Sequence, residues 1–129
     1  LEGKVNHALL SKLLSDPFFS QPPPKSTGRD NFHLSWLLEK LGEENDLAED
    51  VQATLLHLSA LSILDALARY APQTQKLIIC GGGARNNALM NLFKVKFIQV
   101  ARRVQMKICN LGSCKKLGGT TLRVQIKWV

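Results

Sequence analysis

Three consecutive glycines, residues 81–83, are the part of this 129-residue chain whose type and spacing most directly suggest chemistry. They follow an apolar run at residues 77–80, typical of a buried strand, and precede residues 87–93, which read as a helix. A turn without Cβ atoms lets a ligand approach bare backbone, and a helix start offers free N–H groups and partial positive charge. The turn formed by Gly81, Gly82 and Gly83 is therefore a candidate phosphate or nucleotide site.

A second interpretation of the glycines stays open, because tight strand-to-helix turns use glycine in many α/β proteins that bind nothing there. The spacing is not the Gly-x-Gly-x-x-Gly dinucleotide fingerprint, and no Lys-Ser/Thr pair follows to make a P-loop. The glycines alone do not choose between a ligand site and a structural turn.

A proline-rich segment is the second candidate. Three prolines at residues 22–24 force an extended backbone without N–H donors, and a polar loop follows at residues 25–30. Its composition favours a surface linker. The functional alternative is a rigid arm that presents polar side chains to an anionic or sugar ligand, namely Lys25, Ser26, Thr27 and Arg29.

The remaining reactive side chains form no recognisable set. The three histidines lack metal-ligand spacing, and Asp65 lies in the middle of an expected helix. The cysteines, residues 80, 109 and 114, are odd in number and contain no Cys-x-x-Cys pair, so we expect neither a disulfide framework nor a zinc site. We predict no catalytic residue and no metal ligand in this chain.

Length and composition fit one domain with a real core, since 45% of the residues are hydrophobic. No stretch reads as long and apolar enough to cross a membrane, and no signal peptide opens the chain, so a cytoplasmic protein is expected.

The expected elements form a layered α/β architecture. Residues 6–15 and 34–41 read as helices, the second closed by Gly42. Asp46 and Glu49 have the spacing of a capping box that starts a longer helix ending near Tyr70. The glycine turn then joins the strand to the next helix.

Charge divides the chain sharply. Residues 1–93 carry eight Lys/Arg and ten Asp/Glu, whereas residues 94–129 carry nine Lys/Arg and no acidic residue. Alternating residues 104–109 and 122–129 predict two strands with a basic outer face, and Gly118-Gly119 predicts a hairpin turn. A basic tail of this kind favours, as an alternative function, a non-enzymatic module that contacts nucleic acid or an anionic surface. We do not expect nucleic acid as a partner, because few aromatic residues accompany the charges.

Two segments, in this order and spacing, carry a resemblance to a known family: Pro-Pro-Pro-Lys-Ser-Thr-Gly-Arg at residues 22–29 and Cys-Gly-Gly-Gly-Ala-Arg-Asn at residues 80–86. Through them and shorter matches, residues 1–93 resemble the C-terminal half of anhydro-N-acetylmuramic acid kinase. The resemblance implies part of the C-terminal lobe of a sugar kinase/actin/Hsp70-like (ribonuclease H-like) fold. It also implies that the parent enzyme uses ATP and Mg²⁺ to open the ring of anhydro-N-acetylmuramate and phosphorylate it during cell-wall recycling.

Carried over to this chain, the resemblance makes Gly81, Gly82 and Gly83 the adenosine-side loop of the ATP site. Asn86 would hold either the turn or the nucleotide. The segment from Lys25 to Arg29 would lie near the cleft between the lobes, where it either contacts substrate or braces the loop. A homodimer is the oligomeric state that the resemblance implies, and no membrane is expected.

The chain also departs from the family pattern. The lobe with the phosphate-gripping segment and the catalytic base is absent, so we expect the chain to be an inactive fragment. The pattern is expected to stop near Phe93, dividing the chain into a partial nucleotide-side lobe (residues 1–93) and an aberrant basic tail (residues 94–129). The charge break suggests that the tail was translated out of frame or comes from a disrupted gene.

Overall fold

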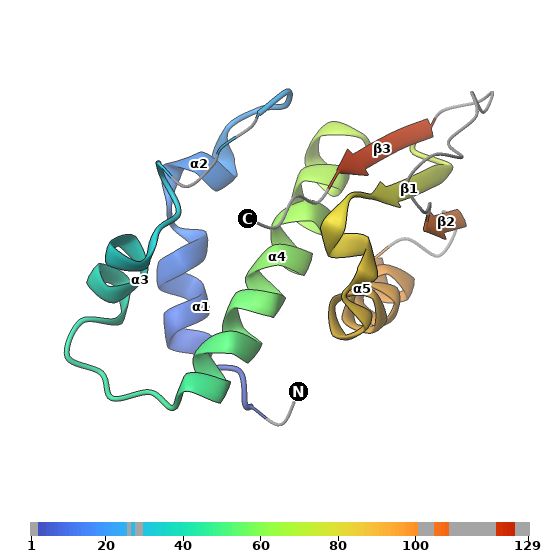
Figure 1. Cartoon of the computed structure of the whole chain (residues 1–129). Helices are drawn as coiled ribbons and strands as arrows, with labels where there is room; N and C mark the ends of the chain where they lie inside the picture. The colour runs from blue at the N-terminus through green and yellow to red at the C-terminus, as the bar shows by residue number, and fades with distance from the viewer. Residues whose placement is uncertain (1–2, 26, 28–29, 101–104, 109–120, 126–129) are drawn as a thin grey trace. The chain divides into compact units, whose positions relative to one another are not determined.

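The computed structural model of the chain describes residues 3–25, 27, 30–100, 105–108 and 121–125. Contacts divide it into two compact units, Leu1–Ser62 (with Val129) and Ile63–Trp128, here called unit 1 and unit 2. The boundary between the two units falls inside a long helix. The division at residue 93, between a partial lobe and a basic tail, stays a prediction. In chain order the elements are α1 (His7–Leu14), α2 (Pro17–Ser20), α3 (Leu34–Leu41), α4 (Ala48–Tyr70), β1 (Lys76–Cys80), η1 (Gly82–Arg85), α5 (Asn87–Val100), β2 (Gln105–Ile108) and β3 (Thr121–Gln125) (Figure 1).

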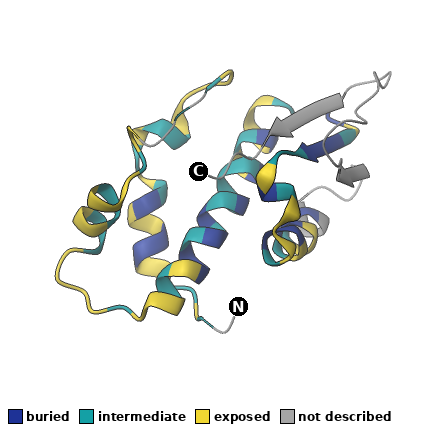
Figure 2. Cartoon of the chain, viewed as in Figure 1, coloured by how far each residue is buried: buried dark blue, intermediate teal, exposed yellow. Residues whose placement is uncertain are grey.

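Unit 1 is built around leucines. Leu9, Leu10 and Leu13 of α1 and Leu58 of α4 form its buried cluster, and half-buried residues such as Trp36 of α3 pack around it. The dark band of buried residues on α1 and α4 in Figure 2 marks this core. Both short helices that the sequence predicted are confirmed, with bounds of 7–14 and 34–41. Gly42 follows the second helix with a φ of 63°, a backbone conformation that favours glycine.

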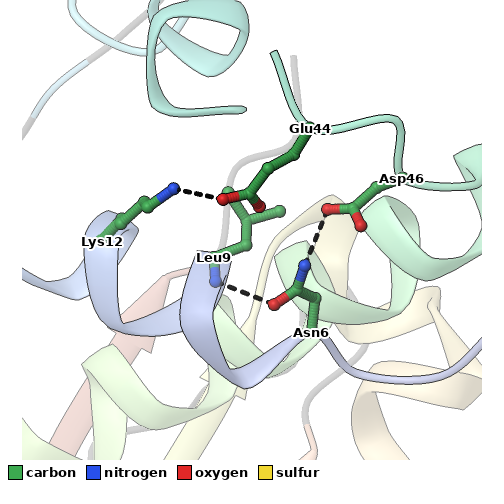
Figure 3. Close-up of polar contacts among 5 residues, drawn as sticks. All are labelled: Asn6, Leu9, Lys12, Glu44 and Asp46. Atoms are coloured by element: carbon green, nitrogen blue, oxygen red, sulfur yellow. Dashed lines mark hydrogen bonds and ion pairs between the residues drawn. The ribbon is translucent and has the colours of Figure 1, made fainter. Parts of the chain in front are cut away.

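Hydrogen bonds connect the first residues of unit 1 to the start of α4, with Asn6 at their centre. The group formed by Asn6, Asp46 and Thr54 is here called the polar clasp. Asn6 Oδ1 caps α1 by accepting from the Leu9 N–H (3.0 Å), and Asn6 Nδ2 donates to Asp46 Oδ2 (2.8 Å) (Figure 3). An exposed ion pair between Lys12 and Glu44 (2.7 Å) lies beside it. The segment also passes so close to α4 that a Cβ on Gly3 would overlap the Glu49 carbonyl.

The predicted capping box at the start of α4 is therefore wrong. The helix begins at Ala48, two residues after Asp46, and the Asp46 carboxylate accepts from Asn6 instead. The local pattern could not show this, because Asn6 lies 40 positions away in sequence.

Thr54 gives the clasp its buried end. Its side chain is 0% exposed; Oγ1 accepts from the Asn6 N–H (2.9 Å) and donates to the Asp50 carbonyl (2.7 Å). We expect Thr54→Val, which keeps the shape but removes the hydroxyl, to lower the free energy of unfolding by about 2 kcal/mol, because it leaves the Asn6 N–H without its acceptor. Urea unfolding followed by helical circular dichroism measures this.

Thr54→Ser is the matched control. It keeps the hydroxyl and removes one methyl group, so it should cost only about 1 kcal/mol. A valine variant as stable as the serine variant would show that the clasp does not stabilise unit 1.

The long helix corrects another expectation. Among the described residues one helix, α4, is long and apolar enough to cross a membrane by length and composition, although the sequence was judged to have no such stretch. This is weak evidence for a span, because core helices of globular proteins pass the same test. In unit 1, α4 supplies the buried Thr54 and Leu58, which is the behaviour of a core helix.

Unit 2 contains a three-stranded sheet in the order β2-β1-β3. Both outer strands pair with β1 in parallel: Leu77 lies opposite Met106 on one side and Leu122 on the other. The predicted strands near residues 104–109 and 122–129 are confirmed in shorter form. The predicted hairpin between them is wrong, because β1 separates them. The Gly118-Gly119 turn and the expected basic outer face lie outside the described residues and side chains.

Helix α5 passes without a break through the position where the family pattern was expected to stop. Phe93 and Phe97, on successive turns, are 0% and 4% exposed, and their rings stack with centroids 6.1 Å apart. The first part of the predicted basic tail therefore belongs to the folded unit 2.

Candidate nucleotide site

Strand β1 leads into the candidate site through the interior of unit 2. Leu77, Ile78 and Ile79 are all buried, so both faces of the strand are covered, as expected for the middle strand of a parallel sheet. Because β1 is paired on both sides and packed on both faces, the position at which the turn begins is fixed.

Gly81 makes the turn possible. Its φ of 92° and ψ of −177° lie in a region of backbone conformation that only glycine occupies readily. A single turn of 3₁₀ helix, η1, follows; the Ala84 N–H donates to the Gly81 carbonyl and the Asn86 N–H to the Gly83 carbonyl, both at 3.1 Å. The first glycine is therefore required by the backbone itself, whatever the turn binds.

Gly82 is different from Gly81. It lies inside η1 without a positive φ, it is exposed, and a Cβ built on it would meet no atom within 4 Å. Neither conformation nor packing therefore demands glycine here. The bare backbone at Gly82 faces open space, which is the arrangement that a closely approaching ligand requires. Gly83, the third glycine, is buried.

Asn86 holds the start of the next helix. Its Oδ1 accepts from the Leu89 N–H (3.0 Å), and its carbonyl accepts from the Met90 N–H (2.9 Å), as in a helix N-cap. Of the two roles left open for Asn86, holding the turn is the one that these hydrogen bonds serve. The cap also fixes the direction in which α5 leaves the turn.

The turn lies at the edge of the sheet where ligands of α/β proteins usually bind. The strands run in the same direction, with Ile79 opposite Ile108 and Cys80 opposite Gln125, so all three have their carboxyl ends at one edge. The turn begins at that edge, directly after β1 (Figure 1). In open parallel sheets the crevice outside the carboxyl ends of the strands is the common ligand site.

The charge of unit 2 suits an anionic ligand. Counted over residues 63–128, the sequence has twelve Lys/Arg and one acidic residue, a net charge of +11, whereas residues 1–62 carry −4. Arg85, the last residue of η1, is exposed beside the turn. A field of this sign raises the local concentration of phosphates.

The second candidate set, around Lys25, belongs to unit 1 and not to the unit with the glycine turn. Lys25 Nζ donates to the carbonyls of Phe18 (3.1 Å) and Phe19 (2.9 Å), and Thr27 Oγ1 accepts from Asn31 Nδ2 (2.7 Å). Ser26 and Arg29 lie outside the described residues.

Two titratable groups elsewhere, His33 and Asp65, have structural partners. His33 Nδ1 caps α3 by accepting from the Trp36 N–H (3.2 Å), and Asp65 pairs with Arg69 one turn later on α4 (3.0 Å). Within the described part of the chain no group of three or more His, Cys, Asp or Glu side chains is arranged to hold a metal ion.

Sequence reasoning missed Asp16. Its Oδ1 caps α2 through the Phe18 N–H (3.0 Å), and its Oδ2 accepts from Trp36 Nε1 (2.9 Å). The Asp-Pro pair, an N-cap residue followed by proline at the first helical position, was the signal that could have revealed this helix start.

Comparison with known proteins identifies the family. The family model described as anhydro-N-acetylmuramic acid kinase matches residues 1–110. The chain belongs to the anhydro-N-acetylmuramic acid kinase family. Proteins named anhydro-N-acetylmuramic acid kinase from Xanthomonas oryzae pv. oryzae and Ralstonia nicotianae are 54% identical to it, over 88 and 90 residues. The one from Pseudomonas syringae pv. syringae is 57% identical over 89 residues.

Each of these kinase matches covers 68% of the chain but only 23% or 24% of the relative, so the chain spans about a quarter of the length of the curated relatives it matches. The helix-rich α/β structure is consistent with part of a sugar-kinase domain. The finer assignments, to a C-terminal lobe and to the ribonuclease H-like fold, stay predictions. So does the out-of-frame origin of residues 94–129, into which the family model extends as far as residue 110.

Proposed function

We propose that this chain is the nucleotide-binding part of an anhydro-N-acetylmuramic acid kinase and that the glycine turn receives the adenosine side of ATP. The observation that carries the proposal concerns Gly82. Its backbone is uncovered although neither the conformation nor the packing of the turn requires glycine at this position. Family membership and the carboxyl-edge position of the turn support it.

Each turn residue has a distinct part in the proposed site. Gly81 bends the chain out of β1, Gly82 lets the nucleotide contact the backbone, and Asn86 fixes the start of α5. The positive charge of unit 2 attracts the phosphates. ATP would supply the phosphoryl group, and its phosphates would supply ligands for Mg²⁺.

The substrate of the complete enzyme is proposed to be anhydro-N-acetylmuramate, converted to N-acetylmuramate 6-phosphate in the cytoplasm as part of cell-wall recycling. A homodimer is proposed as its assembly. The chain alone is proposed to be inactive. Among the described carboxylates, Asp65 is paired with Arg69, Asp46 with Asn6, and Asp16 with Trp36, so none of the three is placed as a free general base.

The second candidate function is a binding module for nucleic acid or anionic surfaces, favoured only by the +11 charge of unit 2. It differs from the nucleotide proposal in its salt dependence. Retention on DNA that falls steeply between 50 and 200 mM salt, on the order of a thousandfold, would favour the binding module.

Calorimetric titration of the chain with ATP and Mg²⁺ tests the proposed nucleotide site. We expect Gly82→Ala to weaken ATP binding by about tenfold, because the new Cβ would occupy space next to the backbone that the nucleotide needs. The stability of this variant should stay within about 0.5 kcal/mol of the parent. Asn91→Ala, at an exposed position one turn into α5, is the matched control and should bind as the parent does.

Two outcomes would count against the proposal: no heat of binding from the folded parent, or equal affinities for the parent and Gly82→Ala. The same samples incubated with the anhydro sugar should form no phosphorylated product, and turnover would contradict the proposed inactivity.

A further inference from the structure

The ammonium group of Lys25 makes intramolecular hydrogen bonds. It donates to two carbonyl oxygens, at 3.1 Å to Phe18 and 2.9 Å to Phe19, and lies 5.1 Å from the centroid of the Phe18 ring. An ammonium has three donors, so two are committed to backbone and the ring faces the charge. The side chain is half-buried. These contacts leave little of the Lys25 charge for a ligand.

The two carbonyls belong to α2, a helix of four residues, Pro17–Ser20. Both carbonyls lie in the last turn of this helix, where carbonyls carry partial negative charge that a lysine complements, and the Phe18 carbonyl also accepts from the Gln21 N–H (3.2 Å). Lys25 follows the three prolines, so its two hydrogen bonds fold the proline segment back onto the end of α2.

An aromatic cluster closes the same loop from its other end. Phe32 contacts Phe18 (5.3 Å between centroids), Phe19 (5.4 Å) and Trp36 (4.7 Å). Trp36 Nε1 in turn donates to Asp16 Oδ2, immediately before α2 (2.9 Å). The start and the end of the segment from residue 16 to residue 36 are therefore tied together, with Lys25 bound to the same α2 residues.

We propose that Lys25 is a positioning residue: its ammonium anchors the proline arm to α2 and so holds the base of the loop that follows, instead of binding sugar or phosphate. The Thr27 hydroxyl, bonded to Asn31 (2.7 Å), is the next fixed point along the loop. The inference does not depend on the proposed nucleotide site, because Lys25 belongs to unit 1 and the glycine turn to unit 2. Its test needs neither ATP nor sugar, so failure of one does not imply failure of the other.

Cleavage of the full chain by endoproteinase Asp-N, which cuts before aspartate, tests the proposal without removing a cleavage site. Cleavage before Asp30 reports opening of the loop, and cleavage before Asp46 reports opening elsewhere in unit 1. Proteolysis of a folded protein follows the population of its open forms. We expect Lys25→Met, which keeps an unbranched apolar side chain but loses the donors, to raise cleavage before Asp30 about tenfold relative to cleavage before Asp46.

Two further variants make the result specific. Lys25→Arg keeps donors for the carbonyls and should restore most of the protection, within about threefold of the parent. Lys40→Met removes a half-buried lysine from α3 and should leave cleavage before Asp30 unchanged. The ratio of the two cleavage rates stays informative even where Lys25→Met loosens the whole unit.

Three results would overturn the proposal. The first is a ratio for Lys25→Met within twofold of the parent, and the second is a failure of Lys25→Arg to restore protection. The third is strong protection of the parent, but not of Lys25→Met, by inorganic phosphate, which would show that Lys25 binds an anion instead.

Discussion

Replacing Phe97 by alanine is expected to lower the free energy of unfolding by about 3 kcal/mol, the loss typical of a large buried side chain. Phe97 is 4% exposed and stacks on Phe93 across one turn of α5, with an angle of 24° between the rings. The variant loses both the buried area and the ring contact, which leaves a cavity beside Phe93. Urea unfolding of the full chain, followed by circular dichroism, measures the loss in free energy of unfolding.

Val95→Ala is the control on the same helix. Val95 is 56% exposed, so its truncation should change the free energy of unfolding by no more than about 0.5 kcal/mol. The comparison matters because Phe97 lies beyond residue 93, where the sequence predicted that an aberrant tail begins. Equal, small effects of Phe97→Ala and Val95→Ala would support that prediction and would show that α5 beyond residue 93 does not contribute to the core.

Replacing Gly81 by alanine is expected to cost about 3 kcal/mol, at the upper end of the range for a residue forced into a sparsely populated backbone conformation. With φ at 92° and ψ at −177°, an alanine must either accept the strain or move the end of β1. Moving β1 is costly as well, because the strand pairs with β2 and β3 on its two sides. Urea unfolding without nucleotide measures this term separately from any effect on binding.

Gly82→Ala again provides the comparison, since a Cβ there meets open space. Alanine substitutions at the two adjacent glycines should therefore have different effects. Gly81→Ala lowers stability, whereas Gly82→Ala leaves stability intact and weakens nucleotide binding. Equal stabilities of the two alanine variants would mean that the turn does not depend on the conformation of Gly81.

The sequence predicted the local features of the fold well where short-range chemistry decides them. Glycine at position 42 ends α3, the proline at 72 follows the end of α4 at Tyr70, and the glycines at 81–83 separate β1 from α5. Each of these signals acts through the backbone within a few residues, so no knowledge of distant partners is needed.

Features decided by distant partners were not predictable in the same way. Alternation in the two late strands showed that they are strands, but alternation is the same for parallel and antiparallel pairing, and only the structure places β1 between them. Asp46 has the spacing of a helix cap, but Asn6 takes its carboxylate. The segment around Lys25 has the composition of an arm that presents polar side chains to a ligand. Lys25 nevertheless donates to two backbone carbonyls, which no sequence pattern specifies.

In the candidate site, too, the sequence predicted the turn but not the role of each residue in it. The glycine run alone left a structural turn and a ligand site equally open. The structure separates the residues: Gly81 serves the backbone, Asn86 serves the helix, and Gly82 remains without a structural reason to be glycine. Sequence could not make this separation, because it depends on the φ angle of one residue and on the empty space around another.

Amide spectra of the ¹⁵N-labelled chain, recorded by NMR during titration with ATP and Mg²⁺, test the central claim most directly. We predict concentration-dependent shifts of the Gly81, Gly82 and Gly83 amides, with amides of α1 in unit 1 unchanged. In Gly82→Ala the Gly81 and Gly83 amides should shift only at about tenfold higher ATP concentrations. A well-dispersed spectrum in which the three glycine amides stay in place at saturating ATP would contradict the account and leave the turn as a purely structural element.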